Sequence, residues 1–330
     1  MKKKLIFLVK LAVMVVTFAF VGVKIAEAWH TIGEHPVHVD WRWSLLIPLG
    51  YIGVMIDNAL TWLWLARQMG DRSHVTPLIG AYVFSQAGKY APGKLMLVIM
   101  RIERAHRVGM SRETCVLSTL LENAMYTLSG GLVGAIAMFI AVRNHPVYLI
   151  LSGAMVVGLL VFFYPAVFFG VINMVLKSMK RQPIPPSRQF RRRHMFAAVF
   201  MFLPCWVCGG FALWAAVNCL TPAPLNSLPM LSGAFALSVS LGMFSLLPGG
   251  LGVREVIQGI FLAPFLHNSI ILVGAAVGLA RLFQVVVEMI LALIGGVITS
   301  RYPPVSLPPD NEDQQNKAAE IKENSEKISK

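Results

Sequence analysis

Residues 244–255 read FSLLPGGLGVRE and place a proline, three glycines and two adjacent charges inside a strongly apolar region. This break predicts the start of a half-helix, because proline suits the first helical turn and glycine allows the tight turn before it. The first N–H groups of a helix lack partners within the helix and carry the positive end of its dipole, so they favour an anion. A guanidinium at position 254 would suit a phosphate. The residues that we expect to contact such a head group here are Pro248, Gly249, Gly250, Gly252 and Arg254.

A second break of the same kind, QAGKYAPGK at residues 86–94, lies in the first half of the chain. It joins a Pro-Gly turn to two lysines and is expected to offer the same anion chemistry. The residues expected to contribute are Lys89, Pro92, Gly93 and Lys94. Other roles are open for these charges. The lysines could only reach back to cytoplasmic water, and Arg254 with Glu255 could pair with buried charges and hold the second break in place.

Charged residues inside the apolar stretches form a predicted intramembrane charge network. Its members are Asp57, Glu122, Glu255, Arg281 and Glu288. Arg281, Gln284 and Glu288 are spaced i, i+3 and i+7, which puts them on one face of a helix. Charged residues in a membrane normally face the bundle interior or a cavity, so this face is expected to look toward the two breaks. Asp57 could bind a proton or a cation, or it could pair with a basic residue.

The composition is that of a membrane protein. Of the 330 residues, 56% are hydrophobic and 14% are charged, with a mean hydropathy of +0.66. These values predict an all-α polytopic membrane fold without room for a separate soluble catalytic domain. The net charge of +13 suits a cytoplasmic membrane surface better than nucleic acid. Nucleotide-binding and hydrolase motifs do not occur and the histidines lack metal-ligand spacing, so we expect no enzymatic activity, no cofactor and no metal.

About six apolar stretches are long enough to cross a bilayer as helices. They are residues 5–23, 45–66, 115–142, 147–176, 195–220 and 270–300. The basic loops at 67–74, 101–112 and 177–193 are expected on the cytoplasmic side of an inner (cytoplasmic) membrane, because Lys and Arg collect there. Both termini then lie in the cytoplasm. The first stretch is interpreted as a retained signal anchor, and residues 302–330 as a disordered polar tail.

Two further apolar segments, residues 77–100 and 230–265, carry the breaks and are predicted to be re-entrant hairpins. If residues 77–100 crossed the membrane, the arginines at 101–112 and the basic cluster at 177–193 would both lie outside, against the positive-inside rule. The arms of this hairpin have about 11 and 6 residues, roughly 16 and 9 Å of helix, too short for a hydrocarbon core of about 30 Å. The first hairpin is expected to open to the cytoplasm and the second to the outside.

The two halves of the chain resemble each other. Each has a Pro-Gly break, then charged residues, then a long helix in which an acid precedes a Gly-Gly pair. Glu122 precedes Gly130, and Glu288 precedes Gly295, by seven or eight residues. This pattern favours an inverted-topology repeat, in which broken helices face each other at the membrane midplane.

The motif PGGLGVRE, with KYAPGK and the helix that carries Arg281, resembles the lysylphosphatidylglycerol synthase transmembrane region family. This is a flippase-like domain also found in small uncharacterised inner-membrane proteins. The likeness covers roughly residues 5–300, and a Leu-rich segment stands where an aromatic often follows the PGK motif. The resemblance implies a flippase-like transmembrane domain over residues 1–301 and movement of lipid between leaflets. Larger members add a soluble aminoacyl-transferase domain; this chain ends in a short polar tail, so lysyl transfer is not implied.

Together these patterns predict a protein that binds and translocates an anionic phospholipid or a polyprenyl-phosphate-linked lipid across the inner membrane. One alternative is an anion channel or small-anion transporter, since two opposed half-helices also form an ion pore. A second alternative is a non-transporting scaffold for cell-envelope synthesis. In that case the synthesis enzymes would dock on the basic loop at residues 177–193.

Overall fold

The computed structural model describes residues 39–90, 95–141, 146–162, 164–178, 192–243, 248–250 and 252–305. Throughout these ranges the regular structure is helical, with no strand, which confirms the all-α prediction. The predicted span at 5–23, most of the basic loop at 177–193 and residues 306–330 of the predicted tail lie outside the described residues. So do three predicted site residues of the first break, Pro92, Gly93 and Lys94.

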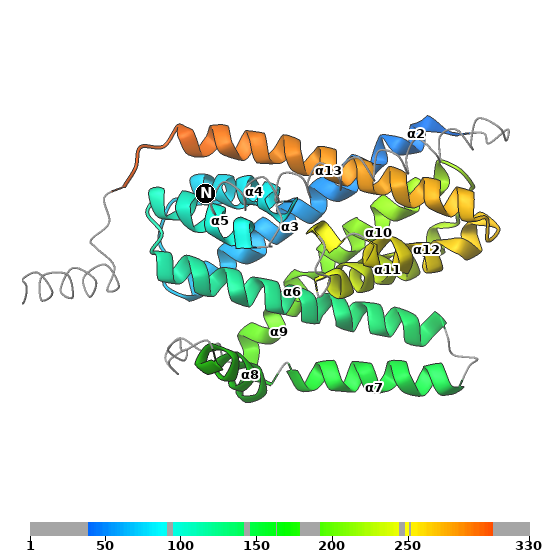
Figure 1. Ribbon diagram of the computed structural model, residues 1–330, viewed down its shortest axis with the longest axis horizontal. Helices are drawn as coiled ribbons and strands as arrows, with labels where there is room; N and C mark the ends of the chain where they lie inside the picture. The colour runs from blue at the N-terminus through cyan, green and yellow to red at the C-terminus, as the bar shows by residue number, and fades with distance from the viewer. Residues whose placement is uncertain are drawn as a thin grey trace, which may run out of the picture.

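Five helical segments are long and apolar enough to cross a membrane, so this is a multi-pass membrane protein. They are Trp41–Gln68, Arg112–Ile140, Arg192–Asn218, Leu225–Gly242 and Ile270–Ser300. Four of them match predicted spans, and the fourth in order was predicted as one arm of a hairpin. They contain the helices α2 (Trp41–Ser44), α3 (Leu46–Gln68), α6 (Arg112–Ala141), α9 (Arg192–Met201), α10 (Leu203–Asn218) and α13 (Ile270–Ser300). In Figure 1, α6 and α13 run along the long axis on opposite sides of α3 and α10.

The prediction of one continuous span over residues 147–176 is wrong. The segment forms two helices, α7 (Pro146–Phe162) and α8 (Pro165–Ser178), and Figure 1 shows α8 turned out of line with α7. Pro165 explains the break. Proline has no backbone N–H to donate, and its ring disfavours the helical conformation of the residue before it. Hydropathy alone does not detect this change of direction.

Both segments that carry the breaks fold into helical hairpins. The first consists of α4 (Val75–Ser85), η1 (Gln86–Tyr90) and α5 (Leu95–Arg107). The second consists of η3 (Leu225–Ser227), α11 (Leu228–Gly242), η4 (Pro248–Gly250), α12 (Val253–Leu262) and η5 (Ala263–Leu266). In Figure 1 the first lies toward the left end of the molecule and the second toward the right end. Their tips, η1 and η4, contact each other in the middle.

Each hairpin packs against the long helix of the other half of the chain. α4 packs on α13, where a Cβ added to Gly295 would lie 2.5 Å from the carbonyl oxygen of Gly80. α11 packs on α6, where a Cβ added to Gly134 would lie 2.5 Å from the Leu237 Cβ. Small residues allow such close helix contact within a membrane. In both halves the hairpin thus packs against the long helix of the other half, and this symmetry supports the predicted inverted repeat.

The ends of α5 and α13 and the start of α6 lie at one end of the molecule, at the left in Figure 1, and exposed basic residues occupy such helix ends. They stand where α5, α8 and α13 end and where α6 and α9 begin: Arg107, Lys177, Arg301, Arg112 and Arg192. The chain beyond α13 stays at this end, since the Val305 N–H donates to the Arg107 carbonyl at 2.9 Å. The molecule therefore has one basic end, and the hairpins point toward the middle from opposite ends.

Candidate functional site

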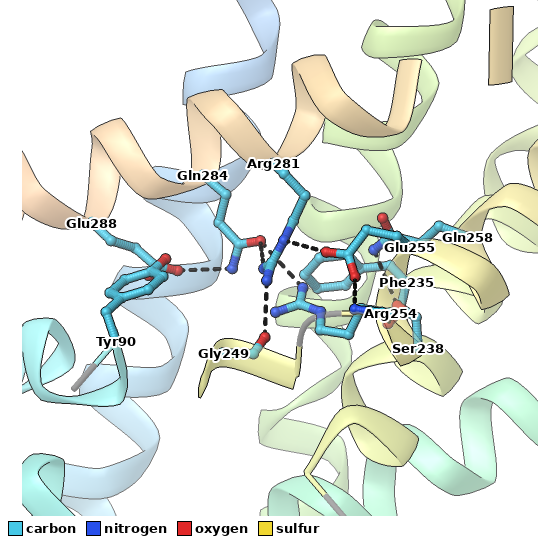
Figure 2. Close-up of polar contacts among 11 residues, drawn as sticks. Tyr90, Phe235, Ser238, Gly249, Arg254, Glu255, Gln258, Arg281, Gln284 and Glu288 are labelled. Carbon is cyan, nitrogen blue, oxygen red and sulfur yellow. Dashed lines mark hydrogen bonds and ion pairs between the residues drawn. The ribbon is translucent and has the colours of Figure 1, made fainter. Parts of the chain in front are cut away.

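One face of α13 carries the polar residues that connect the two hairpin tips. Arg281, Gln284 and Glu288 are all buried on this face, as their spacing predicts. Figure 2 shows them pointing from α13 toward Gly249 of the second tip and Tyr90 of the first. Gln284 joins the row together, because its Nε2 donates to Glu288 Oε1 at 2.8 Å and its Oε1 accepts from Arg281 Nη1 at 3.1 Å.

The second hairpin tip is held to α13 by two contacts of Arg281. Its Nη2 donates to the Gly249 carbonyl at 2.9 Å, and its Nε lies 2.8 Å from Glu255 Oε1. Gly249, Gly250 and Gly252 have φ values of +63°, +73° and +82°. Residues that carry a side chain rarely adopt this left-handed backbone conformation, so the tight turn before α12 requires glycine. The predicted half-helix start is thus present, with α12 beginning at Val253.

The N-terminus of α12 is capped by the protein itself. The Gly252 N–H donates to Glu255 Oε2 at 2.6 Å, so a carboxylate three residues into the helix reaches back to its first turn. The carboxylate occupies part of the place that the sequence assigned to a ligand anion. The remaining anion-binding capacity of this tip therefore depends more on the side chains than on the helix end.

The first hairpin tip is held to α13 through Glu288. The Lys89 Nζ and the Tyr90 hydroxyl both lie 2.6 Å from Glu288 Oε2. A Cβ added to Gly249 would lie 3.6 Å from the Tyr90 ring, so the two tips meet at this tyrosine. Lys89 is thus paired with a carboxylate of the protein. Tyr90 and Gln284 were not among the predicted site residues. Helical spacing already placed Gln284 on the polar face of α13, whereas Tyr90 reaches this face because elements distant in sequence meet here.

Arg254 is the exception in this cluster, because none of the described carboxylates pairs with it. Its side chain is 6% exposed, and its Nη2 donates only to Gln284 Oε1, at 3.2 Å. Its guanidinium carbon lies 5.7 Å from the centre of the Phe235 ring, and its Nε has no hydrogen-bond partner. Three cations, Lys89, Arg254 and Arg281, stand against the carboxylates Glu255 and Glu288. Among the described residues, the cluster between the tips therefore carries one positive charge in excess and suits an anion.

Glu122 lies in a different cluster, with a residue that the sequence interpretation placed wrongly. Arg101, assigned to a basic loop, is 1% exposed inside α5 and forms an ion pair with Glu122 on α6. Tyr82 donates to the other oxygen of Glu122 at 2.6 Å, and Arg101 Nε donates to Ser85 Oγ at 3.1 Å. Arg101 and Ala105 are buried one turn apart on α5, and Val108 is buried just after its end; this i, i+4, i+7 spacing is a signal that helical periodicity offered.

Of the remaining predicted residues, Asp57 is separate from the tips, whereas Pro248 lies in the second tip. Asp57 lies in the middle of α3 on the side of α10, next to Cys205. For Pro248 the structure describes only the backbone, at the start of η4. The structure thus brings together eight predicted residues, Lys89, Gly249, Gly250, Gly252, Arg254, Glu255, Arg281 and Glu288.

Comparison with known proteins identifies the family of the chain. A search of curated proteins gives no match. The family model for the lysylphosphatidylglycerol synthase TM region matches residues 6–292. This match includes both hairpins, their tips and the polar face of α13. The chain therefore belongs to the lysylphosphatidylglycerol synthase TM region family, whose members are membrane proteins linked to lipid handling.

Proposed function

We propose that this protein binds the phosphate of an anionic lipid between its hairpin tips and moves that lipid across the inner membrane. The observation that carries the proposal is Arg254, a buried guanidinium with one hydrogen bond and no carboxylate partner in the described chain. An unpaired buried cation is costly, so such a residue is retained where a ligand completes its interactions. Guanidinium groups hold phosphate oxygens in a bidentate manner.

The residues around Arg254 could accommodate a bound phosphate by exchanging hydrogen-bond partners, with no change in their own charges. Arg281 faces both Glu255 and the Gly249 carbonyl, and it shares Gln284 Oε1 with Arg254. A bound phosphate would draw both arginines away from Gln284 and weaken the contact that holds the second tip to α13. Binding would then loosen this hairpin, which is the kind of change that lipid movement requires. No covalent step is involved, so we propose a transporter and not an enzyme.

We further propose that both hairpins are re-entrant and reach the bilayer midplane from opposite sides. α4 and α12 are 11 and 10 residues long, about 16 and 15 Å of helix, which is half of a hydrocarbon core of about 30 Å. The basic end of the molecule would face the cytoplasm, together with both termini. Anionic lipids are then the partners of the protein, and envelope-synthesis enzymes could dock at the same end.

Lipid movement can be measured with fluorescent lipid in reconstituted vesicles. The probes are phosphatidylglycerol and phosphatidylcholine, each with a labelled short acyl chain that dithionite bleaches only in the outer leaflet. We expect the wild type to expose inner-leaflet phosphatidylglycerol and Arg254→Met to lose this activity. Arg301→Met is the matched control, because it removes an exposed arginine at the basic end and is expected to keep the wild-type rate.

Two outcomes would contradict the proposal. Equal lipid movement by the wild type and Arg254→Met would show that the unpaired guanidinium is not needed. Chloride or phosphate flux through the same vesicles without lipid movement would favour an anion channel or small-anion transporter. Native mass spectrometry of the purified protein adds a binding measurement: an anionic lipid should remain on the wild type and on Arg301→Met, and be lost from Arg254→Met.

A further inference from the structure

Among the carboxylates of the described membrane helices and hairpins that are not exposed, Asp57 is the one that has no ion pair. Glu122 pairs with Arg101, Glu255 with Arg281, and Glu288 with Lys89. Asp57 lies in the middle of α3, eleven residues from either end of the helix, and its Oδ2 is buried without a hydrogen-bond partner. A carboxylate at this depth needs a proton or a cation to neutralise it.

The groups that face Asp57 from α10 are not basic. They are the backbone of Cys205 and the thiols of Cys205 and Cys208. The packing here is close, because a Cβ added to Gly53, one turn before Asp57, would lie 2.7 Å from Cys208 Sγ. α10 contains no lysine or arginine, so it offers no basic side chain that could neutralise the Asp57 carboxylate.

Charged groups of the other elements around α3 interact with residues other than Asp57. Arg254 of α12 and Arg281 and Glu288 of α13 interact electrostatically with Tyr51, six residues before Asp57. Arg101 of α5 and Tyr82 of α4 stack on Trp62, more than one turn after it. On α9, His194 packs against Trp64. On α6, the Tyr126 hydroxyl lies 3.9 Å from Cys205 Sγ. None of these groups supplies an ion pair to Asp57.

A row of unsatisfied polar atoms extends from Asp57 along α3. Asn58 Oδ1, Thr61 Oγ1 and Trp62 Nε1 are buried and, like Asp57 Oδ2, have no hydrogen-bond partner within the described chain. Buried polar atoms are normally satisfied by protein or by ordered water. Asp57 Oδ2 and Asn58 Oδ1 are both acceptors when the carboxylate is ionised, so what each of them lacks is a donated hydrogen. A protonated Asp57 with water along α3 would supply it.

We propose that Asp57 is a proton-binding site and that its protonation couples lipid movement to a proton gradient. The proton binds the carboxylate from one side of the membrane and leaves to the other, with no other bond made or broken. The coupling part rests on the proposed function, whereas proton binding does not.

Proton binding can be tested on the purified protein by infrared spectroscopy, without any transport. The C=O stretch of a protonated carboxyl group should rise and fall with pH in the wild type and be absent in Asp57→Asn. Glu103→Gln removes an exposed carboxylate of α5 and should keep the band. Asp57→Glu should keep a titrating band at a shifted frequency, which separates a lost proton site from a misfolded protein. A band that persists in Asp57→Asn, or no titrating band in the wild type, would overturn the proposal.

Coupling is tested in the fluorescent-lipid vesicles with an imposed pH difference. The wild type should move labelled phosphatidylglycerol faster under one direction of the gradient, and Asp57→Asn should move it at a rate that no longer responds to pH. An unchanged response in Asp57→Asn, or a response to a sodium gradient instead, would overturn the coupling. If the wild type moves no lipid, the proposed function and the coupling both fail, while the infrared result still decides proton binding.

Discussion

Each hairpin buries an arginine, but within the described structure only the arginine of the first hairpin has a carboxylate partner. Arg101 of the first hairpin pairs with Glu122, donates to Ser85 and stacks 4.1 Å from the centre of the Tyr82 ring. Arg254 of the second hairpin has one bond to an amide oxygen and an Nε without a partner. Similar charges in corresponding hairpins therefore have different roles. The first guanidinium is completed by the protein, whereas the second leaves interactions free for an anion.

Removing the partner of Arg101 should have the largest effect on stability. Glu122→Gln keeps the size of the side chain but leaves a buried guanidinium without a carboxylate, which typically costs about 3–5 kcal/mol. Unfolding free energies measured in mixed micelles should fall by this amount. The double variant Arg101→Met, Glu122→Leu should recover most of the loss, because it removes both charges. A single variant as stable as the wild type would mean that Arg101 is also free for a ligand.

Alanine at the tight glycine contacts should cost an intermediate amount. In Gly295→Ala and Gly134→Ala the new Cβ would lie 2.5 Å from an atom of the facing helix, and such overpacking costs about 1–3 kcal/mol. Gly274→Ala is the control, since no atom lies within 4 Å of a Cβ placed there. Similar losses at positions 295 and 134 would show that both hairpins are held equally. A loss at only one would mean that the other hairpin is the more mobile.

Removal of the free guanidinium should not destabilise the fold. Arg254→Met takes away a buried charge that lacks a carboxylate, so the free energy of unfolding should stay the same or rise by about 0.5–2 kcal/mol. The same variant should lose bound anionic lipid. A decrease in stability comparable to that of Glu122→Gln would contradict the distinction between the two arginines.

The smallest effect is expected at the contact between the tips and α13. Tyr90→Phe removes a 2.6 Å hydrogen bond to Glu288, which is worth about 0.5–1.5 kcal/mol, while Glu288 keeps Lys89 and Gln284. Hydrogen exchange at residues 86–90 should rise roughly fivefold. Tyr302→Phe, at an exposed tyrosine after α13, should leave this exchange unchanged. No change in Tyr90→Phe would show that Lys89 alone holds the first tip.

Much of the site could be predicted from the sequence, because it depends on local rules. Glycines with a proline in an apolar segment predicted the turn before α12, and helical spacing predicted the shared face of Arg281, Gln284 and Glu288. The structure did not follow the charge rule at Arg101. Positive-inside reasoning grouped this residue in one loop with Arg104, Arg107 and Arg112, but the helix continues from Leu95 to Arg107 and buries Arg101.

The sequence by itself determined the membrane class, the two breaks, the polar face of α13 and the basic end, since these depend on composition and on periodicity along one chain. Only the tertiary structure decided which charges are neutralised. Lys89 and Glu288 are far apart in sequence, as are Arg101 and Glu122, and each pair meets because a hairpin packs against a long helix. Two charges form an ion pair only when the fold brings them close in space, and in the described structure the fold leaves Arg254 and Asp57 without an ion-pair partner.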